Sequence, residues 1–390
     1  MLPVENDVYS PIVARFLRID DTTWGEQKKG YVVRYRGSLY NQDTVQAYDQ
    51  LRDSLRSVGV TPLFRMEENR HAVILLPGVI QVKPTKIWGN IVFFGLTVLS
   101  VMFTGGYSSV GNLPSTINGW IQLMIAGLPF TIALLAILVS HEFGHYLAGR
   151  YHKTAVTLPF FIPFPLSLFG TMGAFIQLKE PPKNRRILLD IGIAGPLAGL
   201  IVAIPVLLLG LYLSPITQIP FQRTLMPTLE GNSVLYLLLK FIVKGQLLPH
   251  PFSYSGLTPV LYWIRYFFTG QPLPLGGMDV ALNPIAWAGW AGLLVTALNL
   301  IPAGQLDGGH IMYVLLGRHT SRLLPFILGG LLLLGLVWSG WWFWAALIFF
   351  LGRFHAEPLD QITPLDPRRK ALAVLGVIVF ILVFMPVPLI

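Results

Sequence analysis

The sequence predicts a mainly α-helical, polytopic membrane protein with six to seven transmembrane helices and a re-entrant extended hairpin, preceded by a small soluble α/β domain. Hydrophobic residues make up 53% of the 390 positions and charged residues only 12%, with a mean hydropathy of +0.61. Soluble domains seldom have this balance. The charges gather in about the first eighty positions and in a few short loops, between long apolar runs typical of transmembrane helices.

Residues 1–84 are expected to form the small cytoplasmic α/β domain. Runs rich in β-branched, aromatic and other apolar residues predict strands at 31–37, 61–66 and 71–76. Between the first two, apolar residues at helical spacing predict a helix over residues 45–55. The expected order is therefore strand, helix, strand, strand.

Residues 85–390 are expected to form the membrane-embedded domain. Apolar runs predict spans at residues 88–103, 121–149, 187–213 and 283–301, with further runs at 323–338, 341–351 and 371–387. The third span contains Gly195 and Gly199 in a GxxxG arrangement, which lets another helix approach closely. The aromatics Trp338, Trp341 and Trp344, together with Trp342, predict a belt at the membrane interface.

The helical pattern breaks between residues 151 and 186. Pro159, Pro163 and Pro165 forbid a continuous helix there, and the glycines and apolar residues of 170–178 indicate an extended hairpin. Such a backbone at membrane depth has to be sheltered by protein.

The basic residues predict the orientation in the membrane. With the amino-terminal domain inside the cell, most basic loop residues fall on the cytoplasmic side: Arg150, Lys153, Lys179, Lys183, Arg185, Arg186, Arg318, Arg322, Arg353, Arg368, Arg369 and Lys370. The net charge of +9 is thereby explained by topology and anionic lipid, and we expect no nucleic-acid partner.

The amino terminus shows no secretory or transit-peptide pattern. We therefore expect the first span to direct insertion into the cytoplasmic membrane of a bacterium. A plastid membrane is the alternative if a transit peptide has been removed.

The sequence His141-Glu142-Phe143-Gly144-His145 lies near the end of the second expected span. A helix places residues four apart on one face, so both imidazoles can reach one metal ion with Glu142 beside it. The chain contains no cysteine, so any metal has to be held by His, Asp or Glu. The alternative is that these three residues are hydrogen-bonded to other polar groups inside a helix bundle and hold no metal. This alternative is less favoured, because ionisable groups at membrane depth are costly.

A catalytic zinc takes three protein ligands, so two histidines leave the set incomplete. Asp307 is the best candidate for the third, because Pro302, Gly304, Gly308 and Gly309 break an apolar helix around it. An ordinary helix end with a cytoplasmic Asp explains this residue equally well when it is taken alone.

The two motifs together, HExxH on an apolar helix and NxxPxxxLDGG at the end of a later span, resemble the site-2 protease family of intramembrane metalloproteases, peptidase family M50. Further similarity lies at residues 170–174, at 181–186, and at Asp190 followed by 195–199. The resemblance covers roughly residues 120–320, the expected catalytic core. The chain resembles the branch without an inserted PDZ domain, which includes chloroplast and cyanobacterial members.

The resemblance implies that His141, His145 and Asp307 hold one zinc ion per chain. It also implies that Glu142 acts on the attacking water, and that Asn299 binds substrate or stabilises the oxyanion. The implied activity is hydrolysis of peptide bonds in or near the transmembrane segments of other membrane proteins. The implied partners are single-pass membrane protein substrates within the lipid bilayer.

Two other functions are alternatives to proteolysis. A divalent-cation transporter usually contains an internal repeat, which we do not find, and it gives Glu142 no role. An inactive scaffold would be free to lose ligands or Glu142, and none is lost.

Two further features have open interpretations. The extended hairpin either pairs with an unwound substrate strand or is purely structural. Asp190 and Asp279 lie near the ends of expected spans, so we expect them to be helix caps or to be solvated at the membrane interface.

Overall fold

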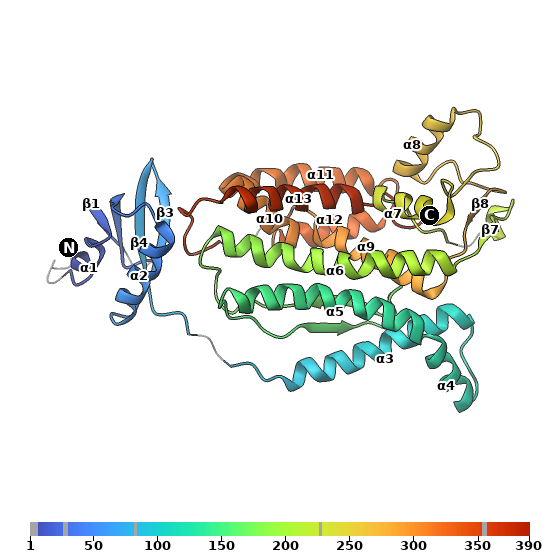
Figure 1. Ribbon diagram of the computed structural model, residues 1–390, viewed down its shortest axis with the longest axis horizontal. Helices are drawn as coiled ribbons and strands as arrows, with labels where there is room; N and C mark the ends of the chain where they lie inside the picture. Colours follow the sequence, from blue (N-terminus) through green and yellow to red (C-terminus); the bar gives the residue numbers. More distant parts are fainter. Residues whose placement is uncertain (1–6, 26–29, 82–83, 226–227, 353–356) are drawn as a thin grey trace.

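The computed structural model describes residues 7–25, 30–81, 84–225, 228–352 and 357–390. The chain is mainly helical, with a small sheet at the amino-terminal end and long helices lying side by side in the remainder (Figure 1). The division at residues 84 and 85 stays a prediction.

The amino-terminal part is a four-stranded antiparallel sheet of order β1-β2-β4-β3. Its elements are α1 (Ser10–Val13), β1 (Leu17–Trp24), β2 (Val33–Leu39), α2 (Thr44–Arg56), β3 (Val60–Glu67) and β4 (Arg70–Pro77). The sequence predicted β2, α2, β3 and β4 but missed α1 and β1. Strand β1 was missed because Leu17 is the one buried side chain in it, and the charged residues that follow obscure the alternation of apolar and polar residues.

Helix α2 packs one apolar face on the sheet. Asp43 caps its amino terminus, accepting from the amides of Val45 and Gln46. Tyr48 meets Phe64 of β3 edge to face, with ring centroids 5.1 Å apart. Helix α2 thus covers one face of the sheet, and β3 is an edge strand.

A segment from the far end of the chain, residues 357–363, completes that edge, and we call it the connector. The amide of Phe64 donates to the Leu359 carbonyl at 3.0 Å, and the amide of Gln361 donates to the Phe64 carbonyl at 3.1 Å. The connector therefore extends the sheet beside β3, and Leu359 is buried in the domain's apolar core.

The other side of the connector contacts the membrane part. The amide of Leu359 donates to the Pro182 carbonyl at 3.0 Å, and that of Asp360 donates to the Lys183 carbonyl at 2.7 Å. Lys183 also pairs with Asp49 of α2 at 2.9 Å. Backbone pairing on both sides of the connector thus docks the sheet onto the helices.

Among the described residues, three helices are long and apolar enough to cross a membrane: α3 (Trp88–Val110), α5 (Leu128–Tyr151) and α6 (Arg185–Leu213). The remaining helices are shorter: α4 (Ile117–Ala126), α7 (Val234–Lys244), α8 (Pro259–Thr269), α9 (Pro284–Asn299), α10 (Asp307–Leu316), α11 (Leu324–Leu334), α12 (Gly340–Leu351), α13 (Pro367–Val383), and the 3-10 helices η2 (Arg223–Leu225) and η3 (Gly317–Leu323). The structure supports an integral membrane protein, and the expected six to seven spans are not confirmed.

The second expected span, residues 121–149, is wrong as a single helix. Gly127 separates α4 from α5, and Pro129 lies in the first turn of α5. A Cβ at Gly127 would lie 2.0 Å from the Met102 carbonyl oxygen of α3. The break lets α3 contact the start of α5 directly.

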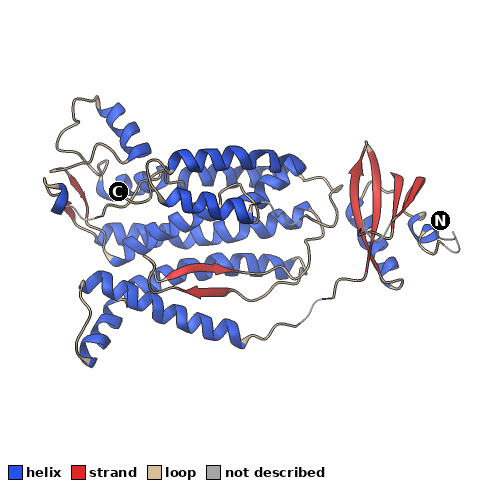
Figure 2. Ribbon diagram, turned by 180° about the vertical axis from the view of Figure 1, so that it is seen from behind, coloured by secondary structure: helices blue, strands red, loops and turns tan. Residues whose placement is uncertain are grey.

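The expected hairpin is present as β5 (Phe160–Pro163) and β6 (Thr171–Phe175), which pair antiparallel. Figure 2 shows it between α3 and the other helices. Side chains of α3 hold it; for example, Ser100 Oγ donates to the Gly170 carbonyl at 2.5 Å, and Asn90 Nδ2 donates to the Pro159 carbonyl at 2.9 Å. Helix α3 therefore shelters this nonhelical backbone.

The end of the molecule opposite the sheet domain contains α7, α8 and the short pair β7 (Ile216–Gln218) and β8 (Met278–Val280). Lys240 is fully buried there and lies 3.3 Å from Glu230 and 3.2 Å from Asp279. The expectation that Asp279 is an interfacially solvated residue is wrong, because its carboxylate is buried in this ion pair.

Replacing Leu359 by Ala should loosen the connector. Leu-to-Ala changes in cores cost about 2 to 5 kcal/mol, and each 1.4 kcal/mol is about tenfold in an equilibrium. We expect the amides of Phe64 and Gln361 to exchange with deuterium at least about tenfold faster, measured by exchange mass spectrometry. The exposed Val8→Ala is the control. Unchanged exchange at both amides in Leu359→Ala would contradict the docking described here.

Candidate metal centre

His141 and His145 lie one turn apart on α5, and both imidazoles are buried. Their Nε2 atoms are 3.2 Å apart. The Nδ1 atom of His145 lies 2.7 Å from the Ile191 carbonyl of α6. A carbonyl only accepts, so Nδ1 carries the proton, and the Nε2 lone pair is left for a metal.

Asp307 joins the two histidines from a different part of the chain. It begins α10 after the helical break at residues 300–306, and its carboxylate oxygens lie 3.3 Å from Nε2 of His141 and 3.3 Å from Nε2 of His145. The break is tight, because a Cβ at Gly308 would lie 1.9 Å from the Leu300 carbonyl oxygen. The glycine therefore allows the carboxylate to reach the histidines.

The three side chains fit a zinc ion. Their ligand atoms all lie within 4.8 Å of one another. Two ligands of a tetrahedral zinc, each about 2.0 to 2.1 Å from the metal, lie about 3.4 Å apart. The separations of 3.2 to 3.3 Å agree with that geometry. Two imidazoles and one carboxylate also leave a fourth position, as in catalytic zinc sites.

Helix α6 approaches the histidines through glycines, as the GxxxG pattern indicated. A Cβ at Gly195 would lie 2.0 Å from Nε2 of His145, and one at Gly199 would lie 3.2 Å from Nδ1 of His141. In the other direction, a Cβ at Gly144 would lie 2.5 Å from the Ala194 carbonyl oxygen. The two helices are therefore in backbone contact at the level of the ligands.

Glu142 and Asn299 lie beside this cluster. Glu142 is buried, and Asn299 Nδ2 lies 3.3 Å from Nε2 of His141. Both line a mostly apolar cavity of about 610 Å³, together with His141 and the hairpin residues Met172 and Gly173. All five residues predicted for the site are thus brought together.

The belt of tryptophans at the membrane interface stays a prediction, and most of these side chains contact protein. Trp338 and Trp344 line the cavity, and Trp341 is buried with its Nε1 donating to the Pro386 carbonyl at 2.7 Å. Trp342 is about half exposed. The sequence alone did not predict that Trp338, Trp344 and Leu389 line the cavity, because no local motif marks these positions.

Asp190 is also more than a cap or a solvated residue. Its carboxylate accepts from Arg369 Nε of α13 at 2.9 Å and lies 2.9 Å from His152 Nε2, at the end of α5. This cluster joins three helices at the end of the bundle nearest the sheet domain. His310 packs against Gly192 of α6.

Comparison with known proteins agrees with this geometry. The model of the family described as "Peptidase family M50" matches residues 129–334, just over half of the chain, and no PDZ domain is matched. The chain belongs to peptidase family M50. This match includes all five site residues.

Its relatives include chloroplast proteins. "Probable zinc metalloprotease EGY2, chloroplastic" of Arabidopsis thaliana is 30% identical over 298 residues, covering 76% of this chain and 48% of that protein. "Probable zinc metalloprotease EGY1, chloroplastic" of Oryza sativa subsp. japonica is 30% identical over 333 residues, covering 78% and 51%. The chain thus spans about half the length of these relatives. No solved structure is significantly similar to it.

Gly195→Ala should weaken zinc binding. The new Cβ would collide with His145, whose ring cannot swing away without losing its bond to Ile191. Disturbing groups that orient metal ligands typically costs about 10- to 100-fold in affinity, and we expect a loss of that size in a competition titration with a zinc chelator. Gly199→Ala should lower the zinc affinity less, because its Cβ would lie 3.2 Å from Nδ1 of His141.

The matched control is Gly329→Ala in α11, where a Cβ meets nothing within 4 Å. Equal zinc affinity in Gly195→Ala and Gly329→Ala would refute the close approach of α6 to the ligands.

Proposed function

We propose that this chain is an intramembrane zinc metalloprotease that hydrolyses peptide bonds in or near the transmembrane segments of single-pass membrane proteins. The observation that carries the proposal is the convergence of His141, His145 and Asp307 at zinc-ligand spacing, with Glu142 in the same cavity. Membership of peptidase family M50 and the relatives named as zinc metalloproteases support it.

Each site residue has a chemical role in this proposal. His141, His145 and Asp307 would hold one zinc ion, which would supply Lewis-acid chemistry and lower the pKa of the attacking water. The Glu142 carboxylate accepts the proton of the attacking water and passes it to the leaving amine. The Asn299 amide donates to the carbonyl oxygen as negative charge develops there. The mostly apolar walls of the cavity favour exclusion of water from these groups once a substrate is bound.

The proposed location is the cytoplasmic membrane of a bacterium, with the sheet domain in the cytoplasm and six to seven spans. The basic segments around Lys153, Lys183 and Arg369 lie at the end of the bundle that faces the sheet domain (Figure 1). The positive-inside rule favours that end as cytoplasmic. Arg353, which also supported this orientation, lies outside the described residues.

The hairpin is proposed to hold the substrate in extended form. A helical peptide hides its carbonyls from attack, so the substrate has to unwind before cleavage. Strand β6 pairs with β5 along one edge, and its residues Thr171, Met172 and Gly173 line the cavity that contains Glu142. Pairing with β6 would fix an unwound segment beside the catalytic groups.

Glu142→Gln should retain about one zinc per chain and lose cleavage of a single-pass reporter. General acid–base catalysis contributes about 10²- to 10⁴-fold, so we expect a loss in that range or larger. Zinc content and cleavage are measured on the same detergent-purified protein, with the exposed Glu68→Gln as control. Normal cleavage by Glu142→Gln would exclude the proposed role, and zinc-free wild type would exclude the site.

Cysteine cross-linking tests the hairpin, because the chain has no native cysteine. In a Glu142→Gln background, Met172→Cys should form disulfides with single-cysteine substrates at alternate positions around the cleavage site, since an extended chain repeats every two residues. Leu166→Cys, on the exposed turn of the hairpin, is the control. Cross-links spaced three or four residues apart would indicate a helical substrate and contradict strand pairing.

A further inference from the structure

A second cavity lies between the sheet domain and the helices, far from the metal centre along the chain's long axis. Its volume is about 600 Å³. Five segments line it: α2, the start of β3, the stretch after β4, the loop before α6, and the connector. The lining residues are Arg52, Arg56, Val60, Thr61, Val79, Ile80, Gln81, Glu180 and Leu359. Ligand sites are common at such domain junctions and of this size.

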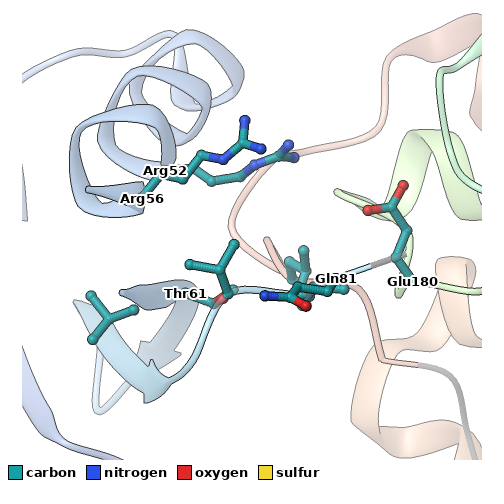
Figure 3. Close-up of a pocket in the computed structure, with 9 residues that line it drawn as sticks. Arg52, Arg56, Thr61, Gln81 and Glu180 are labelled. Carbon is teal, nitrogen blue, oxygen red and sulfur yellow. The ribbon is translucent and has the colours of Figure 1, made fainter. Parts of the chain in front are cut away.

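Two guanidinium groups dominate one wall. Arg52 and Arg56 are four residues apart on α2, so they share one helical face, and Figure 3 shows both side chains extending toward the same space. Like charges at this spacing destabilise a helix. Neither guanidinium has a carboxylate partner within the described parts of the chain.

Several other arginines of the same domain are engaged by carboxylates. In the same domain, Arg34 pairs with Glu67 at 3.2 Å, Arg36 pairs with Asp21, and Arg65 lies 3.5 Å from Glu357. The neighbouring carboxylate on α2, Asp49, is engaged by Lys183. Arg52 and Arg56 thus differ from Arg34, Arg36 and Arg65 in having no ion pair among the described residues, and they line the cavity.

The walls around these arginines are held in place. Thr61 Oγ1 donates to the Gly78 carbonyl at 2.8 Å, which fixes the start of the stretch after β4. Leu359 is anchored by the connector's pairing with β3. On the membrane side, Glu180 Oε1 accepts from the Ala155 amide at 2.9 Å. The cavity is therefore formed before any ligand arrives.

We propose that this cavity binds a phosphate-bearing anion through Arg52 and Arg56. Two guanidinium groups match phosphate oxygens through paired, charge-assisted hydrogen bonds, and lysine would not replace them fully. Glu180 lies across the cavity from the arginines (Figure 3), so the part of the ligand that faces it is a hydroxyl or amine donor.

The phosphate has two possible sources, a soluble phosphorylated compound or the headgroup of an anionic lipid at the adjacent membrane surface. In both cases the ligand bridges the sheet domain and the membrane part, and its binding holds them together. The proposal does not depend on the proteolytic function proposed above.

The test uses the full-length, zinc-loaded protein. In detergent, inorganic phosphate is titrated by calorimetry at constant ionic strength. In nanodiscs, deuterium exchange of α2 is compared between phosphatidylglycerol and phosphatidylcholine. We compare wild type with Arg52→Gln/Arg56→Gln, with the charge-preserving Arg52→Lys/Arg56→Lys, and with Arg15→Gln/Arg70→Gln, which removes the same charge from exposed sites elsewhere on the domain.

Wild type and the Arg15→Gln/Arg70→Gln control should bind phosphate in detergent, or should show protection of α2, that is, slower deuterium exchange in phosphatidylglycerol than in phosphatidylcholine. Arg52→Gln/Arg56→Gln should lose at least tenfold in affinity or all of that protection, with unchanged zinc content, and the lysine variant should be intermediate. Binding in solution identifies a soluble anion, and protection only in phosphatidylglycerol identifies a lipid headgroup. Equal losses in both glutamine variants, or no response of wild type in either arm, would overturn the proposal.

Discussion

Two imidazoles and a carboxylate can share one metal inside an apolar bundle only if helix backbones approach more closely than most side chains allow. An ionisable residue at membrane depth costs about 2.5 to 3.5 kcal/mol, so three together need compensation that metal binding supplies. Gly144, Gly195 and Gly199 remove the side chains that would separate α5 from α6. Because this approach also carries Ile191 to His145, packing and ligand orientation depend on the same contact.

The remaining architecture protects backbone that is not helical. The break before Asp307 and the β5–β6 hairpin both leave backbone groups without helical partners, and each lies against helices of the same chain. The connector adds a link from the sheet domain to this region: Gln361 Nε2 donates to the Tyr313 hydroxyl of α10 at 2.7 Å, and α10 is the helix that begins at Asp307. The docked domain is thus in physical contact with an element that carries a metal ligand.

The sequence was most informative where short motifs indicate the functional residues. Helical spacing brought His141 and His145 together, and the proline and glycine content around Asp307 indicated that the helix unwinds. It was least informative where contacts join distant segments. Gly127 interrupts a mostly apolar run, and the ion-pair partners of Asp190 and Asp279 include residues of α13 and α7. The pairing of the connector with β3 spans nearly 300 positions, and no local signal predicts it.

The most direct test of the metal centre is zinc K-edge X-ray absorption on the purified protein, compared with Asp307→Ala and His141→Ala. The account predicts one zinc per chain, with two imidazoles and further oxygen ligands at about 2.0 to 2.1 Å. Each substitution should remove its own ligand from the spectrum or release the metal. A wild-type spectrum without two imidazoles, or one that neither substitution changes, would show that zinc binds elsewhere and would contradict the account.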